Sequence, residues 1–396
     1  MAVNIEKIYY SAIREYQMEL LGGEEGLWNS ISWIHIVEVE SNAEFLKGEE
    51  LVLYTGILRQ KGNELINFAK EIKKAGATGL VINIGPYIES VPQELIDFAN
   101  ENAFPVFTLP WNVKLVEFAR RYCAMIIREE EADRNMCSAF RGVILSPENE
   151  DEYATYFSKH EVFKTKKYCM IKCLPDITIS NDEQSDYTKI YYSLRQIYER
   201  IVSRYKDDFV IFRFDNYLTV VIPDTDRQEC EEIILKIADK TASFIKIKNE
   251  DIKLHFAVSR NSLKLNELSF YYDKLSTVCR LMKKSGEKIR FWDDLGTWEL
   301  ILSIGDDKRL KEFRKTNIGI LEKYDNKNGT EYCHILDVYL EEDANMPNAA
   351  EKCHVHRNTF AYHLKKISEM IDCDLRSTED RSRLYIAFRI KELMEL

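Results

Sequence analysis

The segment from Met346 to Leu364, MPNAAEKCHVHRNTFAYHL, constrains the fold more than any other part of the chain. Residues 348–352 are predicted to form a short helix in which the small side chains of Ala349 and Ala350 let a second helix approach closely. A longer helix follows, with an inner apolar stripe at helical spacing formed by Phe360, Leu364, Ile367 and Ile371. Two helices joined by a tight connection predict a helix-turn-helix.

The longer helix opens with His356-Arg357-Asn358-Thr359. Helix-turn-helix proteins place base-reading side chains at this end of their second helix. Asn358 and Arg357 are able to make bidentate contacts to adenine and guanine edges, each worth roughly 1–3 kcal/mol of discrimination. Thr359 has the chemistry to cap the helix, to contact a phosphate, or to do both. We therefore expect these residues to contact double-stranded DNA.

Four further residues of this helix, Tyr362, His363, Lys365 and Lys366, are expected to face outward, opposite the apolar stripe. We expect the two lysines to hold phosphates, which position a protein on DNA without specifying sequence. His354 is interpreted as a surface residue of the turn. The alternative interpretation of the whole segment is a surface amphipathic helix with some basic residues.

Charge is unevenly distributed along the 396 residues, which together carry a formal net charge of −11. Residues 352–391 contain nine Lys/Arg against five Asp/Glu, so the other 46 Lys/Arg and 61 Asp/Glu give the rest of the chain a net charge of −15. An acidic body argues against a protein that coats nucleic acid without specificity. One basic end on an acidic body suits a regulator that contacts DNA through a small module.

The nine cysteines show no spacing typical of a metal site or a disulfide framework. Cys169 and Cys173 lie four apart in a strand-like run, without a second pair of ligands nearby. An odd number of cysteines and no recognisable secretory leader predict reduced thiols in the cytoplasm. We expect no metal, no cofactor and no membrane association, because no run of residues is apolar and long enough to span a bilayer.

Residues 1–130 alternate predicted strands with predicted helices, which is typical of an α/β domain with a mostly parallel sheet. The expected strands are 34–39, 50–54, 79–84 and 106–109, and the expected helices are 63–75 and 92–102. A long helix over 113–134 follows, whose apolar stripe is Leu115, Phe118, Ala119, Tyr122, Met125 and Ile126. Two interpretations of this helix stay open, and both can hold at different ends: a core helix of the first domain, or a dimer-forming connector between domains. Residues 131–149 are expected to form a connector helix or linker.

Residues 150–300 have a different order of predicted elements, with a hairpin that turns at Asp215-Asn216. The expected strands are 167–174, 209–214, 218–222, 254–259 and 289–292, and the expected helices are 188–205, 229–245 and 266–284. Because a β-α-β-β-α-β order is typical of ferredoxin-like folds, we expect an α+β domain here. Residues 301–396 read as all helical, with a connector at 325–330 and the DNA-reading core within 331–394.

Motifs of common enzyme classes are absent, and we expect no catalytic residues. No Gly-x-Gly-x-x-Gly follows a strand, and the sequence has no Walker loop, no His-Glu-x-x-His, no nucleophile elbow and no Cys-x-x-Cys. The string Gly22-Gly23-Glu24-Glu25-Gly26 resembles a diguanylate cyclase signature but lacks its closing Phe. In the middle region, Asp215 alone supplies neither a Gly-rich turn nor a pair of carboxylates for magnesium.

The three regions, in this order, resemble the purine catabolism regulator (PucR-like) family of bacterial transcription factors. The C-terminal stretch that carries the resemblance is VHRNTFAYHLKKISEMIDCDL followed by RSRLYIAFRI. The first region is similar through SWIHIVEVE, LKGEELVLYTG, AGATGLVINIG and AFPVFTLP, and the middle region resembles a degenerate cyclase-like (GGDEF-like) domain through FRFDNYLTVVIP, AVSR and FWDDLGTWELIL.

This resemblance implies base and phosphate contacts by the same His356–Thr359 segment and by Tyr362. The chain departs from the family pattern at His363, where members commonly have Arg, and at Phe360-Ala361, where Leu-Arg is usual. Because a neutral histidine attracts a phosphate less than an arginine does, the resemblance implies a weaker contact at His363.

Small-molecule binding is expected at the first region. Open α/β sheets bind ligands outside the carboxyl ends of their strands. Three loops meet this condition: Thr55-Gly56, Gly85-Pro86-Tyr87 and Pro110-Trp111-Asn112. Gly56 and Gly85 would permit close approach of a ligand, whereas Tyr87 and Trp111 would stack on a flat heterocycle; the alternative is ordinary loop glycines and packing aromatics.

Together these observations predict a cytoplasmic, ligand-responsive transcriptional regulator that binds an operator as a homodimer or higher homo-oligomer. The resemblance implies an effector from the catabolism of a purine or a related nitrogenous metabolite. Two alternatives remain: a metabolic enzyme that acts on such a compound through the first region, and a scaffold whose basic end binds an acidic protein.

Overall fold

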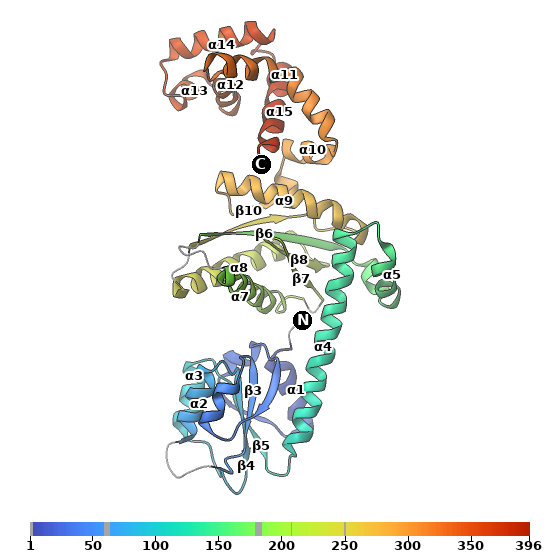
Figure 1. The fold of residues 1–396 in the computed structure, drawn as a ribbon, viewed down its shortest axis with the longest axis vertical. Coiled ribbons are helices and arrows are strands. Elements are labelled where there is room, and N and C mark those ends of the chain that lie inside the picture. Colours follow the sequence, from blue (N-terminus) through green and yellow to red (C-terminus); the bar gives the residue numbers. More distant parts are fainter. Residues whose placement is uncertain (1–2, 59–63, 179–183, 207, 249–250) are drawn as a thin grey trace.

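The structure is a computed structural model that describes residues 3–58, 64–178, 184–206, 208–248 and 251–396. It is arranged in three tiers along its longest axis, with one long helix, α4 (Leu115–Leu145), running from the first tier into the second (Figure 1). The first and second tiers each contain a five-stranded sheet, and the third is helical. A mixed α/β beginning and a helical end were both expected from the sequence.

The first sheet has the strand order β1-β5-β4-β3-β2. Its strands are β1 (Glu19–Gly22), β2 (Trp33–Ile36), β3 (Glu50–Tyr54), β4 (Gly79–Ile84) and β5 (Val106–Pro110). Strands β2 to β5 are parallel, as predicted, and β1 pairs antiparallel with β5. The prediction missed β1, and it extended β2 to Val39, whereas the strand ends at Ile36. All five residues of β3 are buried, as expected for a parallel strand covered on both faces.

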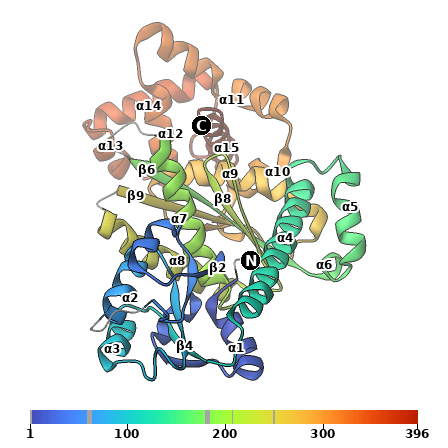
Figure 2. The ribbon, with the colours of Figure 1, turned by 60° about the horizontal axis from the view of Figure 1, so that its bottom comes forward.

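Two helices cover each face of this sheet, which makes three layers (Figures 1 and 2). Helix α1 (Ile5–Tyr16) and the first half of α4 pack on one face, and α2 (Glu64–Lys74) and α3 (Gln93–Glu101) pack on the other. The predicted start of α2 at Asn63 lies outside the described residues. Short 3-10 helices η1 (Glu24–Trp28) and η2 (Glu40–Phe45) connect the elements.

Helix α4 is longer than predicted, because the prediction ended it at Arg134 and it continues to Leu145. Its first half contributes Phe118, Tyr122 and Ile126 to the core of the first tier. Its last half contributes Phe140 and Val143, among others, to the core of the second tier. The helix is therefore a core helix of both tiers, and its part in dimer formation stays a prediction.

The second sheet has the strand order β10-β9-β6-β8-β7. In chain order this tier contains α5 (Glu150–Lys159), α6 (Val162–Thr165), β6 (Tyr168–Thr178), α7 (Gln184–Val202), β7 (Val210–Phe214), β8 (Tyr217–Pro223), α8 (Arg227–Lys248), β9 (Asp251–Val258), η3 (Leu265–Glu267), α9 (Leu268–Ser285), β10 (Ile289–Phe291) and η4 (Trp292–Asp294). Alternate residues of the strands face two separate cores, one under α7 and α8 and the other under α9 and the end of α4. The predicted elements are present with shifted ends, whereas α5 and α6 were not predicted.

The hairpin between β7 and β8 turns at Asp215-Asn216, as predicted. Phe214 pairs with Tyr217 across the two-residue turn, and Asp215 adopts a positive φ of 51°. A positive φ at the first turn residue is typical of the tight turns that suit twisted antiparallel strands.

The third tier consists of α10 (Thr297–Ile304), α11 (Asp307–Asn328), α12 (Tyr332–Glu341), α13 (Met346–Lys352), α14 (Arg357–Ile371) and α15 (Thr378–Met394). Leu336, Phe360 and Ile367 are among the residues that fill a common core between α11, α12, α14 and α15. The predicted connector at 325–330 is wrong for most of its length, because α11 continues to Asn328. Within the described residues, no helix combines the length and apolarity needed to cross a membrane.

Candidate functional site

Helices α13 and α14 form the predicted helix-turn-helix geometry. Asn345 caps α13, since its side-chain oxygen accepts a hydrogen bond from the Asn348 N–H at 3.3 Å. Ala349 and Ala350 are buried where the two helices meet, which agrees with their expected role. In the turn, His354 has a positive φ of 54° and an exposed side chain, as the sequence suggested.

The N-terminus of α14 is capped by His356. Its backbone is extended (φ −65°, ψ 143°), and its Nδ1 accepts a hydrogen bond from the Asn358 N–H at 3.2 Å. With Nδ1 as acceptor, the neutral ring carries its proton on Nε2. Thr359 therefore does not cap this helix, because the helix already begins at Arg357.

The exposed side of α14 contains most of the predicted DNA-contacting residues. His356, Arg357, Asn358 and Thr359 are all exposed in its first turn. Tyr362, with 64% of its surface exposed, follows one turn later. Lys365 is also exposed, and its Nζ lies 3.9 Å from Glu369, a surface pair that contributes little stability. The structure thus brings these side chains to one open end and side of the helix.

His363 and Lys366 do not face outward as expected. The Lys366 Nζ hydrogen-bonds to the Tyr324 hydroxyl at 3.1 Å and lies over the rings of Tyr324 and Tyr332. Those two rings stack with centroids 5.4 Å apart. Hydrogen bonding to Tyr324 and then Tyr332 raises the pKa of Lys366. The His363 ring lies 5.5 Å from that of Tyr332, and its buried Nδ1 has no hydrogen-bond partner in the part of the chain that the structure describes. Both side chains therefore turn toward α11 and α12.

Carboxylate side chains hold the helices behind α14 in place at two points, which the sequence analysis missed. The Asp325 carboxylate caps α12, accepting hydrogen bonds from the N–H groups of Tyr332 (2.9 Å) and Cys333 (2.8 Å). Burial raises the pKa of Asp325, but these hydrogen bonds and one from Thr330 outweigh it, so the pKa lies below its ordinary value. On α15, Arg389 forms ion pairs with Asp337, Glu341 and Glu392.

The predicted effector loops lie at the carboxyl ends of β3, β4 and β5, where α4 begins. Thr55 is buried, and both its N–H and its hydroxyl donate to one oxygen of Glu38, at 3.1 and 2.6 Å. The Gly56 N–H donates to the other oxygen of Glu38 at 3.1 Å. Glu38 is thus a further residue that the sequence analysis missed, although it lies in the quoted stretch SWIHIVEVE.

Neighbouring side chains leave no room for a Cβ at either loop glycine. Gly56 has a φ of +73°, and a Cβ there would lie 2.7 Å from the Ile88 side chain. A Cβ on Gly85 would lie 2.7 Å from the Trp111 side chain. The rings of Tyr87 and Trp111 are 5.5 Å apart and tilted by 59°, and both remain exposed (48% and 41%). The packing alternative therefore accounts for the glycines, and the two aromatic faces stay open to solvent.

Asn112 is exposed next to Trp111, so the structure brings the three loops to one edge of the sheet. The buried Asn83 side chain supports this edge by donating to the carbonyls of Leu109 (3.3 Å) and Pro110 (2.9 Å). This edge offers two aromatic rings and polar loop atoms, which suits a flat polar molecule. Among the described residues, no three His, Cys, Asp or Glu side chains are arranged to hold a metal ion.

Known proteins match the two ends of the chain. Residues 10–126 match the Purine catabolism regulatory protein-like family, and residues 332–390 match the PucR C-terminal helix-turn-helix domain. These two matches leave residues 127–331 uncovered, so the cyclase-like middle domain stays a prediction.

Three curated relatives come from Bacillus subtilis (strain 168). The chain is 20% identical over 251 residues to the DNA-binding transcriptional activator AdeR, which covers 62% of this chain and 56% of that protein. It is 30% identical over 92 residues to the proline-responsive transcriptional activator PutR, a match that covers 23% of this chain and 22% of PutR. It is 28% identical over 97 residues to the purine catabolism regulatory protein, a match that covers 24% of this chain and 18% of that protein. The chain thus spans about half or less of the length of these relatives. The chain contains an N-terminal domain of the Purine catabolism regulatory protein-like family and a PucR C-terminal helix-turn-helix domain.

Proposed function

We propose that the protein is a ligand-responsive, DNA-binding transcriptional regulator that acts in the cytoplasm. The observation that carries this proposal is the exposed N-terminus of α14, with Arg357 and Asn358 in its first turn, within a match to a helix-turn-helix domain. In the proposed complex this end of α14 enters the major groove, and Arg357 and Asn358 read base edges.

The other predicted DNA-contacting residues differ in how far their side chains are exposed. We propose that the exposed side chains of His356, Thr359, Tyr362 and Lys365 bind phosphates and sugars, which set the orientation of the helix without reading sequence. Lys366 instead supports α14 from behind, because its ammonium group lies on the stacked rings of α11 and α12.

We further propose three domains: 1–130 as the ligand-sensing domain, 150–300 as a ferredoxin-like domain joined to it by 131–149, and 301–396 as the DNA-binding domain. The ferredoxin-like assignment is supported by the β-α-β-β-α-β order of β6 to β9 and by the order β9-β6-β8-β7 within the sheet. No cyclase activity is proposed for this domain.

The effector is proposed to be a small nitrogenous metabolite bound at the edge formed by Thr55, Gly56, Gly85, Tyr87, Trp111 and Asn112. One relative is named for proline and another for purine catabolism, which supports this class of compound. Because α4 begins at Leu115, three residues after Asn112, a change at the loops would move the helix that enters the second tier. In a homodimer this movement would alter the spacing of two DNA-binding helices and thereby operator affinity.

The test is operator binding by the full chain at fixed salt concentration. Arg357→Ala and Asn358→Ala should each weaken specific binding by about 1–3 kcal/mol and leave thermal unfolding nearly unchanged. Arg309→Ala, a highly exposed arginine on α11, is the matched control and should bind like wild type. Operator affinity that is unaffected by both α14 substitutions would refute the proposed DNA contacts. Affinity that stays constant across added purines, ureides and proline would refute the sensor part.

A further inference from the structure

Two cysteine thiols meet inside the core of the second tier. Cys169 of β6 and Cys230 of α8 are both fully buried, and their sulfur atoms lie 3.4 Å apart. The two residues are 61 positions apart in the chain, so the fold itself creates this contact. Because a disulfide joins its sulfur atoms at about 2.05 Å, the two thiols need to approach by only about 1.4 Å to become bonded.

Two other buried thiols of this tier have partners of a different kind. The Cys173 Sγ lies 3.1 Å from the Tyr198 hydroxyl, and the Cys279 Sγ faces the backbone carbonyls of Lys172 (3.4 Å) and His255 (3.7 Å). Burial raises the pKa of Cys279 to about 12. Such thiols behave as small apolar core residues. Within the described residues, no second pair of sulfur atoms lies within hydrogen-bond distance.

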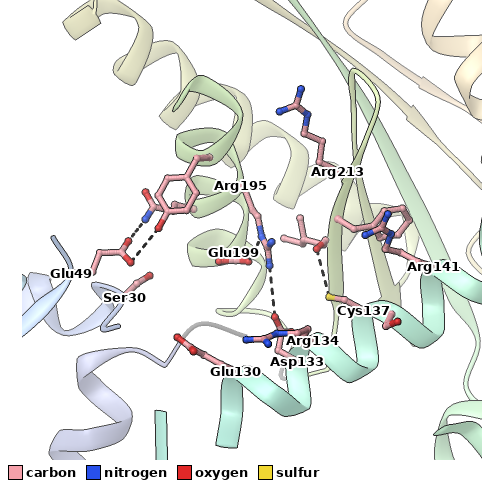
Figure 3. Close-up of a pocket in the computed structure, with 15 residues that line it drawn as sticks. Ser30, Glu49, Glu130, Asp133, Arg134, Cys137, Arg141, Arg195, Glu199 and Arg213 are labelled. Atoms are coloured by element: carbon pink, nitrogen blue, oxygen red, sulfur yellow. Dashed lines mark hydrogen bonds and ion pairs between the residues drawn. The ribbon is translucent and has the colours of Figure 1, made fainter. Parts of the chain in front are cut away.

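A thiol that lines a cavity also differs from this pair. Cys137 of α4 borders the cavity between the first and second tiers, and its Sγ lies 3.7 Å from the Ile211 carbonyl (Figure 3). Burial raises the pKa of Cys137 to about 11, so the thiolate, which is the form that reacts with oxidants, is scarce at neutral pH. A position beside a cavity is therefore not sufficient, and a reactive cysteine also needs a stabilised thiolate.

Cys230 meets this second condition. The Cys169 thiol hydrogen-bonds to it, and this effect outweighs burial, so the pKa of Cys230 lies below its ordinary value. The same hydrogen bond, together with burial, raises the pKa of Cys169. Cys230 also lies in the first turn of α8, where the N-terminal end of a helix favours negative charge. Within the pair, Cys230 is therefore the nucleophile, and Cys169 is the thiol that reacts second.

A surface cavity of about 590 Å³ brings solvent close to Cys230. Thr225 lines this cavity, and its hydroxyl oxygen lies 3.9 Å from the Cys230 Sγ, so one side chain separates the sulfur from the cavity. The lining also contains four carboxylates and one lysine, which are Asp224, Asp226, Glu229, Glu232 and Lys206. This excess of negative charge disfavours an anionic oxidant such as glutathione disulfide, but it does not repel a small uncharged peroxide.

We propose that Cys169 and Cys230 form a peroxide-sensitive site that is oxidised to an intramolecular disulfide. The Cys230 thiolate attacks one oxygen of hydrogen peroxide: an S–O bond forms, the O–O bond breaks, and the leaving hydroxide takes up a proton to become water. The Cys169 sulfur then attacks the sulfur of this sulfenic acid: the S–S bond forms, the S–O bond breaks, and the hydroxyl leaves with the Cys169 proton as a second water. The two thiols together lose two electrons, and the peroxide is reduced to water.

The disulfide would tie the first turn of α8 to β6, the middle strand of the second sheet. Helices α7 and α8 share one core with that strand, so a shift of α8 reaches α7. Helix α7 in turn holds the first tier, because Tyr192 and Gln196 donate to Glu49, and it holds α4 through the pair Arg195–Asp133 (Figure 3). Oxidation would thus be an input to the relative position of the two tiers, separate from the effector loops and from DNA. Cytoplasmic disulfides of this kind are usually transient and redox-sensing.

The experiment treats the reduced, folded full chain with hydrogen peroxide, alkylates the remaining thiols in denaturant, and maps non-reduced peptides by mass spectrometry. We expect a peptide pair linked through Cys169 and Cys230. This link should form at least about tenfold faster than any other disulfide, because the fold holds the two reacting groups together. Glutathione disulfide at the same concentration should form the link more slowly than peroxide does.

Single variants separate the two roles. Cys169→Ser keeps a hydrogen-bond donor beside Cys230 but cannot form the disulfide, so oxidation should stop at a Cys230 sulfenic acid that dimedone traps. Cys230→Ser should leave Cys169 unmodified, because burial keeps its thiol protonated. Cys173→Ala is the matched control, since Cys173 is buried on the same strand, and it should form the disulfide like wild type. Circular dichroism verifies that each variant is folded.

Three results would overturn the proposal: no link between Cys169 and Cys230 in folded wild type under excess peroxide, a link that forms only in denaturant, or other cysteine pairs that link equally fast. A dimedone adduct on Cys169 in Cys230→Ser, with none on Cys230 in Cys169→Ser, would overturn the assigned roles. Glutathione disulfide that acts as fast as peroxide would contradict the role of the acidic cavity. Because no DNA is present, this test can fail while the proposed regulatory function holds, and the reverse.

Discussion

The ion cluster around Arg389 should determine how firmly α15 is attached to α12. Only 10% of the Arg389 side chain is exposed, and its guanidinium lies 2.8–3.0 Å from carboxylate oxygens of Asp337, Glu341 and Glu392. Replacing Arg389 by Ala would leave three carboxylates close together without a counter-charge. We therefore expect Arg389→Ala to loosen these two helices without affecting the two sheets.

The size of the effect follows from burial. Removing one partner from a fully buried ion pair costs about 3–5 kcal/mol. Here the three carboxylate side chains keep 31–45% of their surface exposed, so solvent screens part of the remaining repulsion. We expect a loss of about 2 kcal/mol in the local opening free energy, which corresponds to roughly 30-fold faster amide exchange.

The direction in which this destabilisation changes with pH tests whether it is electrostatic. In the wild type, burial outweighs the attraction of Arg389 and raises the pKa of Asp337. Without the attraction of Arg389, the pKa of Asp337 in the folded state rises further above its unfolded value, so the folded state gains protons relative to the unfolded state. Such groups stabilise at low pH and lose that contribution as pH rises. The deficit of the variant should therefore be large at pH 7 and smaller near pH 4.5.

Hydrogen–deuterium exchange of the full chain measures this effect locally. Peptides from α12 and α15 should exchange faster in Arg389→Ala, and peptides from β4 should not change. Arg389→Met, which keeps most of the side-chain volume, separates loss of packing from loss of charge. If Arg389→Ala exchanges like wild type, or if its deficit grows toward pH 4.5, the electrostatic reasoning is wrong.

Three further predictions concern single positions. Gly85→Ala should destabilise the first tier by about 1–3 kcal/mol, because its Cβ would lie 2.7 Å from Trp111; thermal unfolding and tryptophan fluorescence measure this. Lys172 is buried, and within the described residues its hydrogen-bond partners are the neutral Tyr272 carbonyl and Ser276 hydroxyl. Desolvation lowers the pKa of Lys172 to about 7, so the free energy of unfolding should rise with pH from about 7 up to the ordinary lysine pKa of about 10.4. Lys172→Met should remove that rise, which urea titrations at pH 6 and 9 measure. His363→Arg should leave the log–log slope of operator binding against salt concentration unchanged, because the side chain at this position turns toward α11 and α12 and away from the exposed side of α14.

Each of these predictions has a control or a contrary outcome. Gly319→Ala is the control for Gly85, because a Cβ there meets only the flexible Lys315 side chain inside a helix and should not destabilise. A pH-independent difference between Lys172→Met and wild type would contradict the assigned titration. A slope that is steeper by about one unit for His363→Arg would show that this position reaches a phosphate after all.

The elements that were predicted correctly are those whose buried residues form a continuous or periodic apolar pattern in the sequence. Strands β3 and β4 and helix α14 follow from such patterns, and their predicted cores agree with the structure. Strand β1 was missed because it is four residues long and mostly unburied at the sheet edge. The end of α4 was missed because its charged middle separates two apolar stripes that pack on different sheets.

The candidate sites were predictable to the extent that they depend on local sequence. The exposed first turn of α14 follows from helical spacing alone. The orientation of Lys366 depends on Tyr324, which is 42 residues away, and on its stacking with Tyr332. Likewise, Glu38 meets Thr55 only because β2 and β3 are neighbours in the sheet. Such contacts are set by tertiary structure, which no local pattern encodes.

Helix α4 is 31 residues long, and at 1.5 Å per residue it measures about 46 Å. Because it is one uninterrupted helix held by a core at each end, it acts mechanically as a lever. A tilt of about 5° at its first turn displaces its last turn by about 4 Å, comparable to one residue of chain. A sub-ångström rearrangement among the loops beside its start would thereby be amplified into a shift large enough to change how the far end of the molecule is presented.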